Sequence, residues 1–172
     1  RIAEDAGIAA LAVHGRTRAC AFKGSAEYDT IADIVAATRF PVFANGDITS
    51  PENAAAVIAH TGAAGVMIGR AAQGQPWICG QIAAHLDTGI TPAAPARVEQ
   101  LAILRRHVAE LHDFYGDYMG VRIARKHVGW YLQHRSGYIE YRRQFNILAS
   151  PGEQLRYINQ LSNTDNNEVL AA

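Results

Sequence analysis

A regular alternation of short apolar runs with helical patterns constrains the fold of this chain more than any other feature. The apolar runs cover residues 8–14, 40–45 and 64–69, and none of them shows a helical stripe. Each run is followed by a segment with helical periodicity or a helix-start signal. Strands that alternate with helices through short connections pair in parallel through right-handed crossovers. We therefore expect an α/β fold of about three βα units, with strands buried on both faces.

Local signals support the helices of these units. Ser50 and Pro51 form an N-cap followed by proline at the first helical position, and Gly62 ends that helix. Apolar residues at three- and four-residue spacing predict an amphipathic helix that ends near Arg39. Another helix is expected at residues 76–86.

The pattern changes after this region. Pro92 and Pro95 mark a linker at residues 88–96. Beyond it, apolar residues follow helical stripes, Gly116 separates the first two helices, and the Ser-Pro-Gly-Glu stretch at 150–153 has the outline of a capping box. We expect a small all-helical bundle at 97–161 and a polar, disordered tail at 162–172.

Composition restricts the class of protein. With 49% apolar and 19% charged residues, the chain is typical of a soluble globular protein. No apolar run reaches the roughly 18 residues of a membrane span, and no signal-peptide pattern is present, so we expect a cytoplasmic protein without a membrane partner. Cys20 and Cys79 lie far apart and without metal-ligand spacing. They predict ordinary thiols, with no disulfide framework and no metal site.

The zero net charge conceals a basic middle block. Residues 97–145 hold 9 Lys/Arg and 5 Asp/Glu, whereas residues 1–96 hold 6 and 8. Four of the seven histidines also lie in the middle block. A block of this kind suits a phosphate-rich partner.

Within this block, Arg122, Arg125 and Lys126 fall at helical positions i, i+3 and i+4, so we expect them on one face. His127 and Trp130 belong to another face of the same helix. Because cations neutralise phosphates and aromatic rings stack on unpaired bases, this layout predicts an RNA-binding surface. The structural alternative is a solvated charged face with Trp130 packed against the rest of the protein.

Glycine beside a polar residue recurs at the ends of the last two apolar runs. Asn45, Gly46 and Asp47 end the second run, and Gly69 and Arg70 end the third. Ligands of parallel α/β folds bind at the carboxyl ends of the strands, where glycine lets a phosphate approach backbone N–H groups. Arginine adds donors suited to phosphate. The two turns together predict an anion site, although turn geometry or helix capping explains either turn alone.

His14 ends the first apolar run and is followed by Arg16 and Arg18. A histidine at a strand end is often just a satisfied polar group, but the two neighbouring cations favour a role in substrate binding. Rival motifs are absent: the sequence contains no GxGxxG, GxxxxGK[ST] or HExxH. Their absence disfavours a Rossmann site, a P-loop and a zincin.

Five segments resemble, in order, those of the tRNA-dihydrouridine synthases, and most closely the bacterial B-type enzymes. They are AVHGRTR (12–18), ANGDI (44–48), MIGRAAQGQPWI (67–78), ELHDFYG (110–116) and RIARKHVGWYL (122–132). The NGDI and GRA elements also occur in other FMN barrels, whereas the RKH…WY element is more specific.

The resemblance implies the C-terminal part of a (β/α)8 TIM barrel at residues 1–87, then the linker and a tRNA-binding helical domain at 97–161. It implies that FMN is bound by His14, Asn45, Gly46, Asp47, Gly69 and Arg70. It implies that tRNA is contacted by Arg16, Arg18, Arg122, Arg125, Lys126 and His127. In such enzymes NADPH reduces the flavin, and a uridine becomes 5,6-dihydrouridine by hydride transfer to C6 and proton donation to C5 from a cysteine.

The chain departs from the family at that cysteine. The family's cysteine lies in an asparagine- and glycine-rich loop followed by proline, and neither Cys20 nor Cys79 has this context. A complete barrel takes about 250 residues. We therefore expect no catalytic residue here, an upstream cysteine, no activity of the chain alone, and self-association through the exposed barrel edge. The alternatives are another phosphate- or FMN-binding barrel enzyme, or a non-catalytic RNA-binding module.

Overall fold

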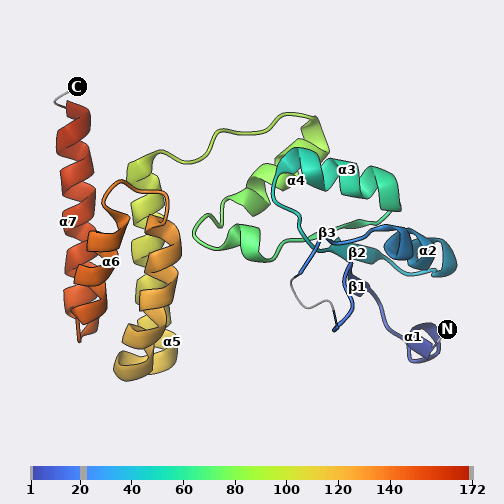
Figure 1. Cartoon of the computed structure of the whole chain (residues 1–172), viewed down its shortest axis with the longest axis horizontal. Helices are drawn as coiled ribbons and strands as arrows, with labels where there is room; N and C mark the ends of the chain where they lie inside the picture. Colours follow the sequence, from blue (N-terminus) through green and yellow to red (C-terminus); the bar gives the residue numbers. More distant parts are fainter. Residues whose placement is uncertain (1, 20–22, 171–172) are drawn as a thin grey trace. The chain divides into compact units, whose positions relative to one another are not determined.

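The computed structural model of the chain describes residues 2–19 and 23–170, with side chains described as far as residue 162. Cys20 lies outside the described residues. The chain divides into two compact units, drawn in Figure 1. The first, which we call the sheet unit, comprises Arg1–Ala72 and Pro76–Ala93, and the second, the helix unit, comprises Gln73–Gln75 and Ala94–Ala172.

The sheet unit is built on a parallel sheet of three strands in the order β1-β2-β3. Its elements are α1 (Ile2–Asp5), β1 (Leu11–His14), α2 (Asp29–Ala37), β2 (Val42–Asn45), α3 (Pro51–Thr61), β3 (Gly65–Met67), the 3-10 helix η1 (Arg70–Ala72) and α4 (Ile78–Thr88). The predicted βα alternation and parallel pairing are confirmed. The short helix α1 was not predicted.

Helices α2, α3 and α4 pack in sequence, α2 against α3 and α3 against α4, as Figure 1 shows. Val42 and Ala44 of β2 are 2% and 0% exposed and join residues of all these helices in one apolar core. Residues of the opposite strand face, such as His14 and Met67, are exposed. The expected burial of β1 on both faces is wrong, because alternate side chains of a strand point to opposite faces and the described helices cover one.

The ends of α3 follow the sequence signals. The Ser50 hydroxyl accepts a hydrogen bond of 3.1 Å from the backbone N–H of Asn53, and Pro51 is the first helical residue. Gly62 ends the helix with φ 67°, in the left-handed region that glycine adopts without strain. This helix therefore begins and ends where its capping residues predict.

The helix unit contains α5 (Arg97–Leu132), α6 (Tyr138–Ile147) and α7 (Pro151–Leu170). Gly116, with φ 71° and ψ 171°, interrupts α5, so the predicted break at this glycine is confirmed. The two halves of α5 meet closely beyond it, since a Cβ on Gly120 would lie 2.8 Å from the Cα of His112. A glycine at 120 is what permits this close approach.

An apolar core joins both halves of α5 to α6 and α7. Its fully or almost fully buried members are Leu104, Val108, Ala124, Val128, Phe145 and Ile158, each 0 or 1% exposed. A polar pair lies beside this core: Nε2 of His112 is 2.8 Å from Oε1 of Gln154, and Gln154 donates to the Val121 carbonyl at 3.1 Å. Both side chains of the pair are buried.

The last helix begins at the predicted capping box. The carboxylate of Glu153 accepts from the backbone N–H of Ser150 at 2.9 Å, and the Ser150 hydroxyl accepts from the Glu153 N–H at 3.3 Å, which is a complete capping box. The helix then continues to Leu170. Residues 163–170 contain no glycine or proline to end a helix. The disorder expected for 162–172 stays a prediction.

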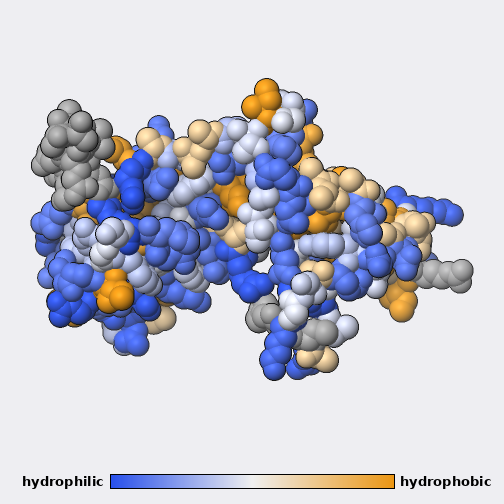
Figure 2. Space-filling view, turned by 45° about the horizontal axis from the view of Figure 1, so that its top comes forward, coloured by the Kyte–Doolittle hydropathy of each residue, from blue (hydrophilic) through white to orange (hydrophobic). Residues whose placement is uncertain are grey.

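The surface combines hydrophilic areas with hydrophobic patches, coloured orange in Figure 2. Among the exposed apolar side chains, Phe114, Tyr118 and Ile139 are 80%, 72% and 80% accessible. In the part of the chain that the structure describes, no helix is both long and apolar enough to traverse a bilayer.

Candidate functional site

The carboxyl ends of the three strands meet at one edge of the sheet. The register pairs His14 with Asn45 and Asn45 with Met67. The Asn45 amide donates to the Met67 carbonyl at 2.7 Å, and its Oδ1 lies 2.6 Å from Nδ1 of His14. Because Oδ1 accepts, His14 must carry its hydrogen on Nδ1. A neutral His14 therefore presents Nε2 as an acceptor.

Asp47 connects three segments beside this edge. Its carboxylate accepts hydrogen bonds from the guanidinium of Arg16, from the backbone N–H of Ala26 at 2.8 Å, and from Nη2 of Arg70 at 3.2 Å. These partners, the hydrogen bond from Arg16 foremost, hold the pKa of Asp47 below its ordinary value. Asp47 is therefore a carboxylate at neutral pH, and it joins the loops that follow β1, β2 and β3.

The backbone at this position is held by tight packing. Gly46 has φ 123°, and a Cβ there would lie 2.8 Å from the Cβ of Ala26 and 3.4 Å from the ring of His14. Asp47 itself has φ 49°, an uncommon conformation for a residue with a side chain. The Tyr28 hydroxyl donates to the Gly46 carbonyl at 2.8 Å, and burial raises the pKa of this phenol, so it remains a donor. Glycine at 46 is thus a packing requirement.

Arg16 lies inside the site. Its side chain is 3% exposed and also donates to the Gly24 carbonyl at 2.7 Å. Its Nε and Nη1 atoms are buried and have no hydrogen-bond partner among the described residues. Arg18, by contrast, is exposed in the same loop. Two nearby arginines that share a sequence motif therefore have different environments.

Gly69 and Arg70 form the open side of the site. A Cβ on Gly69 would meet no atom within 4 Å, so packing within the described residues does not require glycine there. The Arg70 side chain is 60% exposed even though it pairs with Asp47. The structure therefore brings the two predicted glycine turns together through the Asp47–Arg70 pair, and leaves the second turn accessible.

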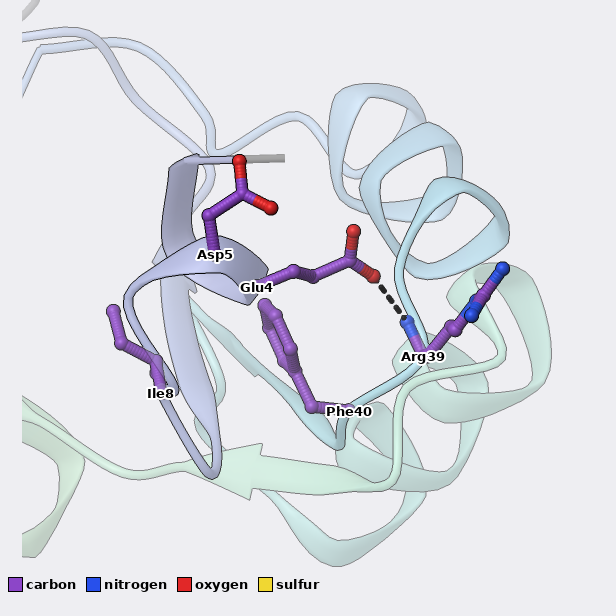
Figure 3. A pocket seen from close by; sticks show the side chains of 5 residues that line it. All are labelled: Glu4, Asp5, Ile8, Arg39 and Phe40. Atoms are coloured by element: carbon purple, nitrogen blue, oxygen red, sulfur yellow. Dashed lines mark hydrogen bonds between the residues drawn. The ribbon is translucent and has the colours of Figure 1, made fainter.

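Two cavities of the sheet unit lie elsewhere. One, of about 430 Å³, is lined by Glu4, Asp5, Ile8, Arg39 and Phe40. Figure 3 shows its lining and the hydrogen bond of 3.1 Å from the Arg39 backbone N–H to the Glu4 carboxylate. It lies near the amino end of β2, opposite to the strand ends where parallel folds bind ligands.

The other cavity, of about 320 Å³, is lined by residues of β2, β3 and α4 and the turn after β3. They are Phe43, Gly65, Val66, Ile68, Cys79, Ile82, Ala83 and Leu86. Its lining is apolar apart from the Cys79 thiol. It is therefore an apolar hollow beside β3 and α4 rather than an anion site.

The predicted RNA residues of the helix unit take several positions on α5. Arg122 and Lys126 are exposed, whereas Arg125 donates to the Leu148 carbonyl at 3.2 Å. His127 is half-buried, and its ring lies 4.7 Å from that of His107 and 5.0 Å from that of Trp130. Burial, followed by the charges of His107 and Lys126, lowers the pKa of His127 below its ordinary value.

Sequence reasoning missed three partners of the site. The Ala26 N–H, the Gly24 carbonyl and the Tyr28 hydroxyl all hold Asp47, Arg16 or Gly46 in place. Two of the three are backbone groups, which carry no residue-type signal. The loop after β1 is also irregular, so no periodicity could have placed it against Asp47.

Comparison with known proteins gives a consistent result. The family model described as dihydrouridine synthase matches residues 1–168. The chain is 62% identical over 154 residues to tRNA-dihydrouridine synthase B of Pseudomonas putida, covering 90% of this chain and 46% of that protein. It is 57% identical over 161 residues to the protein of that name from Pseudomonas aeruginosa (93% and 48%), and 54% over 157 residues to that of Escherichia coli K12 (90% and 48%).

The chain thus spans about half the length of the curated relatives it matches. The match nevertheless covers the sheet unit and most of the helix unit, including every residue of the strand-end site. The chain therefore belongs to the dihydrouridine synthase family.

Proposed function

We propose that this chain is the C-terminal, FMN- and tRNA-binding part of a tRNA-dihydrouridine synthase of the B type. In this proposal the sheet unit is the last part of a TIM barrel, and the helices that follow form the domain that binds tRNA. The complete enzyme is a cytoplasmic NADPH-dependent oxidoreductase that reduces uridine to 5,6-dihydrouridine. The observation that carries the proposal is the Asp47–Arg70 pair, which unites two strand ends in one site in a chain of this family.

The residues present fit the phosphate and ribityl groups of FMN. Gly69 leaves open space beside an exposed Arg70, an arrangement in which an anion can reach both backbone and guanidinium donors. Asn45 and Asp47 supply acceptors for hydroxyl groups. We propose that Arg70 exchanges part of its contact with Asp47 for the phosphate.

When bound, FMN supplies the hydride for the reduction of the uracil ring. The residues of this chain bind the cofactor and orient the side chains around it. Asn45 fixes the ring and tautomer of His14 through the bond to Nδ1, so that Nε2 faces outward as an acceptor. Arg16 and the Ala26 N–H fix the carboxylate of Asp47. We propose that Arg18, in the same loop, contacts substrate, and that buried Arg16 acts by holding Asp47.

The proton donor lies outside this chain in our proposal. Cys79 lines the apolar hollow beside β3 rather than the strand-end site. The chain alone is therefore expected to bind without catalysing the reduction. Adding the remaining half of the barrel should restore the reduction of uridine.

Flavin binding provides the test. We expect the full-length protein to purify yellow and to quench FMN fluorescence, and Arg70→Gln to weaken FMN binding about tenfold or more, since a charged donor to a phosphate is removed. The matched control is Arg39→Gln, because Arg39 lies at the opposite end of the sheet. A colourless full-length protein without affinity for FMN would refute the proposal.

Self-association of the 172-residue chain is a separate proposal. In the described residues, β1 and β3 each pair on one side, and the apolar hollow of about 320 Å³ adjoins β3. Unpaired edge strands beside apolar surface favour pairing between chains. We expect light scattering to report species larger than a monomer. A monodisperse monomer at micromolar concentration would contradict it.

A further inference from the structure

Two basic side chains lie between two aromatic ones along a ridge of α5. Tyr118, Arg122, Lys126 and Trp130 are four residues apart in succession, so each lies beside the next along the helix at a rise of about 6 Å per step. The expectation that Trp130 lies on another face than Lys126 is wrong, since Lys126 lies over its ring. Cζ of Arg122 lies 5.4 Å from the centre of the Tyr118 ring, and Nζ of Lys126 lies 4.9 Å from that of the Trp130 ring. We call these four residues the ladder.

The cations of the ladder are available to a partner. Arg122 donates to the Tyr118 hydroxyl at 3.2 Å, and no carboxylate of the described residues forms an ion pair with Arg122 or Lys126. Two other exposed arginines of this unit differ, since Arg106 pairs with Glu110 and Arg143 with Glu140. The ladder therefore combines charge that is not neutralised by a described carboxylate with an exposed ring at Tyr118 and a half-buried ring at Trp130.

The rings are not explained by the core of the helix unit. Tyr118 is 72% exposed and does not join the apolar cluster around Leu104 and Phe145. Trp130 is half-buried, with His127 at its edge and Lys126 over its face. An exposed tyrosine that a guanidinium holds in place is a ring surface of fixed orientation.

We propose that the ladder binds an unpaired stretch of RNA, with bases stacked on Tyr118 and Trp130 and phosphates bound by Arg122 and Lys126. Every base has a face that stacks on an aromatic ring, and phosphates between stacked bases meet cations placed between the rings. The inference rests on the proposed function in taking RNA as the partner. It extends that function by assigning Tyr118, which carried no expectation, and by giving the order in which rings and cations meet bases and phosphates.

Binding to single-stranded oligouridylate, measured by fluorescence anisotropy with the 172-residue chain, tests the ladder. Tyr118→Leu is expected to weaken binding about tenfold, and Tyr118→Phe to retain it, because stacking needs the ring and not the hydroxyl. Phe114→Leu is the matched control, since Phe114 is an equally exposed aromatic residue outside the ladder. It should leave the affinity unchanged.

Heparin, a polyanion without bases, separates stacking from charge. Tyr118→Leu should leave heparin binding unchanged. Arg122→Gln should weaken the binding of both heparin and oligouridylate, and for oligouridylate it should lower the slope of log affinity against log salt by about 0.7. Equal affinity of Tyr118→Leu and wild type for oligouridylate would overturn the proposal. An equal loss of affinity of Tyr118→Leu for heparin would also overturn the proposal, because it would show that the surface binds acidic partners in general. Flavin binding and its Arg70→Gln variant test the proposed function independently, since Tyr118 and Arg70 lie in different units.

Discussion

The two units of this molecule hold their polar groups in opposite ways. In the helix unit, His112 and Gln154 bond to each other inside a closed interface and are 6% and 0% exposed, while Nδ1 of His112 is buried without a partner among the described residues. In the sheet unit, Asp47 gathers its partners at an edge where Arg70 remains 60% exposed. A sealed polar pair fixes how helices pack, whereas an open one remains available to a ligand. At these two places, then, the helix unit encloses a polar pair between packed helices, whereas the sheet unit leaves a charged pair open at its strand ends.

Truncation of the helix-unit core should have the largest effect. Phe145→Ala removes a ring that is 0% exposed. We expect the free energy of unfolding of the helix unit to fall by about 3–5 kcal/mol. The chain has two tryptophans, Trp77 in the sheet unit and Trp130 in the helix unit, so single-tryptophan variants report each unit in urea unfolding. The control Ile147→Ala, at a residue 77% exposed on the same helix, should cost less than about 0.5 kcal/mol. An equal shift of the Trp77 transition would show that the units unfold together.

Removal of one member of the sealed pair should come next. Gln154→Leu leaves the Val121 carbonyl and the His112 ring without their partner, and we expect a loss of about 1–3 kcal/mol. His112→Leu combined with Gln154→Leu should cost less than the two single changes together, because both polar groups then leave the interface. Chemical denaturation of the four proteins measures this coupling. Additive losses would mean that the pair does not act as a unit.

The capping box of α7 should have a smaller effect. Ser150→Ala removes the acceptor for the Glu153 N–H, and we expect a loss of about 1 kcal/mol. Ser150→Thr retains the hydroxyl and is the conservative control. Thermal unfolding followed by circular dichroism distinguishes the two. Equal melting temperatures for both variants and wild type would show that the start of α7 adds nothing to the stability of the unit.

Acid should affect the two units over different ranges of pH. The pKa of His127 is lowered in the folded chain, so the unfolded chain takes up this proton more readily and the helix unit loses stability as pH falls below about 6.5. The pKa of Asp47 is also lowered in the folded chain. Its contribution to the stability of the sheet unit therefore persists until pH falls below about 4. Urea midpoints from Trp130 and Trp77 between pH 8 and pH 3 measure both. His127→Gln should reduce the loss of helix-unit stability below about pH 6.5. His134→Gln, at an exposed position, should leave that loss unchanged.

The sequence predicted the elements best where a local rule decides. The capping residues Ser50 and Ser150 start their helices, and Gly116 divides α5, because caps and glycine breaks depend on a few adjacent residues. The meeting of Asp47 with Arg70 also followed from the sequence, since carboxyl ends of neighbouring parallel strands share an edge. The expected burial of β1 on both faces was wrong, because burial is not set by a local pattern.

The rest of the site depends on contacts between distant residues. The Ala26 N–H reaches Asp47 across 21 positions through an irregular loop, for which no periodicity exists. Arg16 and Arg18 look equivalent in the sequence, and their different exposure arises from the partners that surround one of them. Tyr118 is different, since its four-residue spacing from Arg122 was visible and could have placed it beside the basic ridge.

The attachment of Asp47 to three loops has a consequence for protein engineering. A chimaera that transplants residues 45–47 alone into another barrel would carry a carboxylate without the guanidinium groups and the amide that hold it. The groups that hold Asp47 therefore come from separate segments of the chain. Successful grafts should have to move the loops after β1 and β3 along with it.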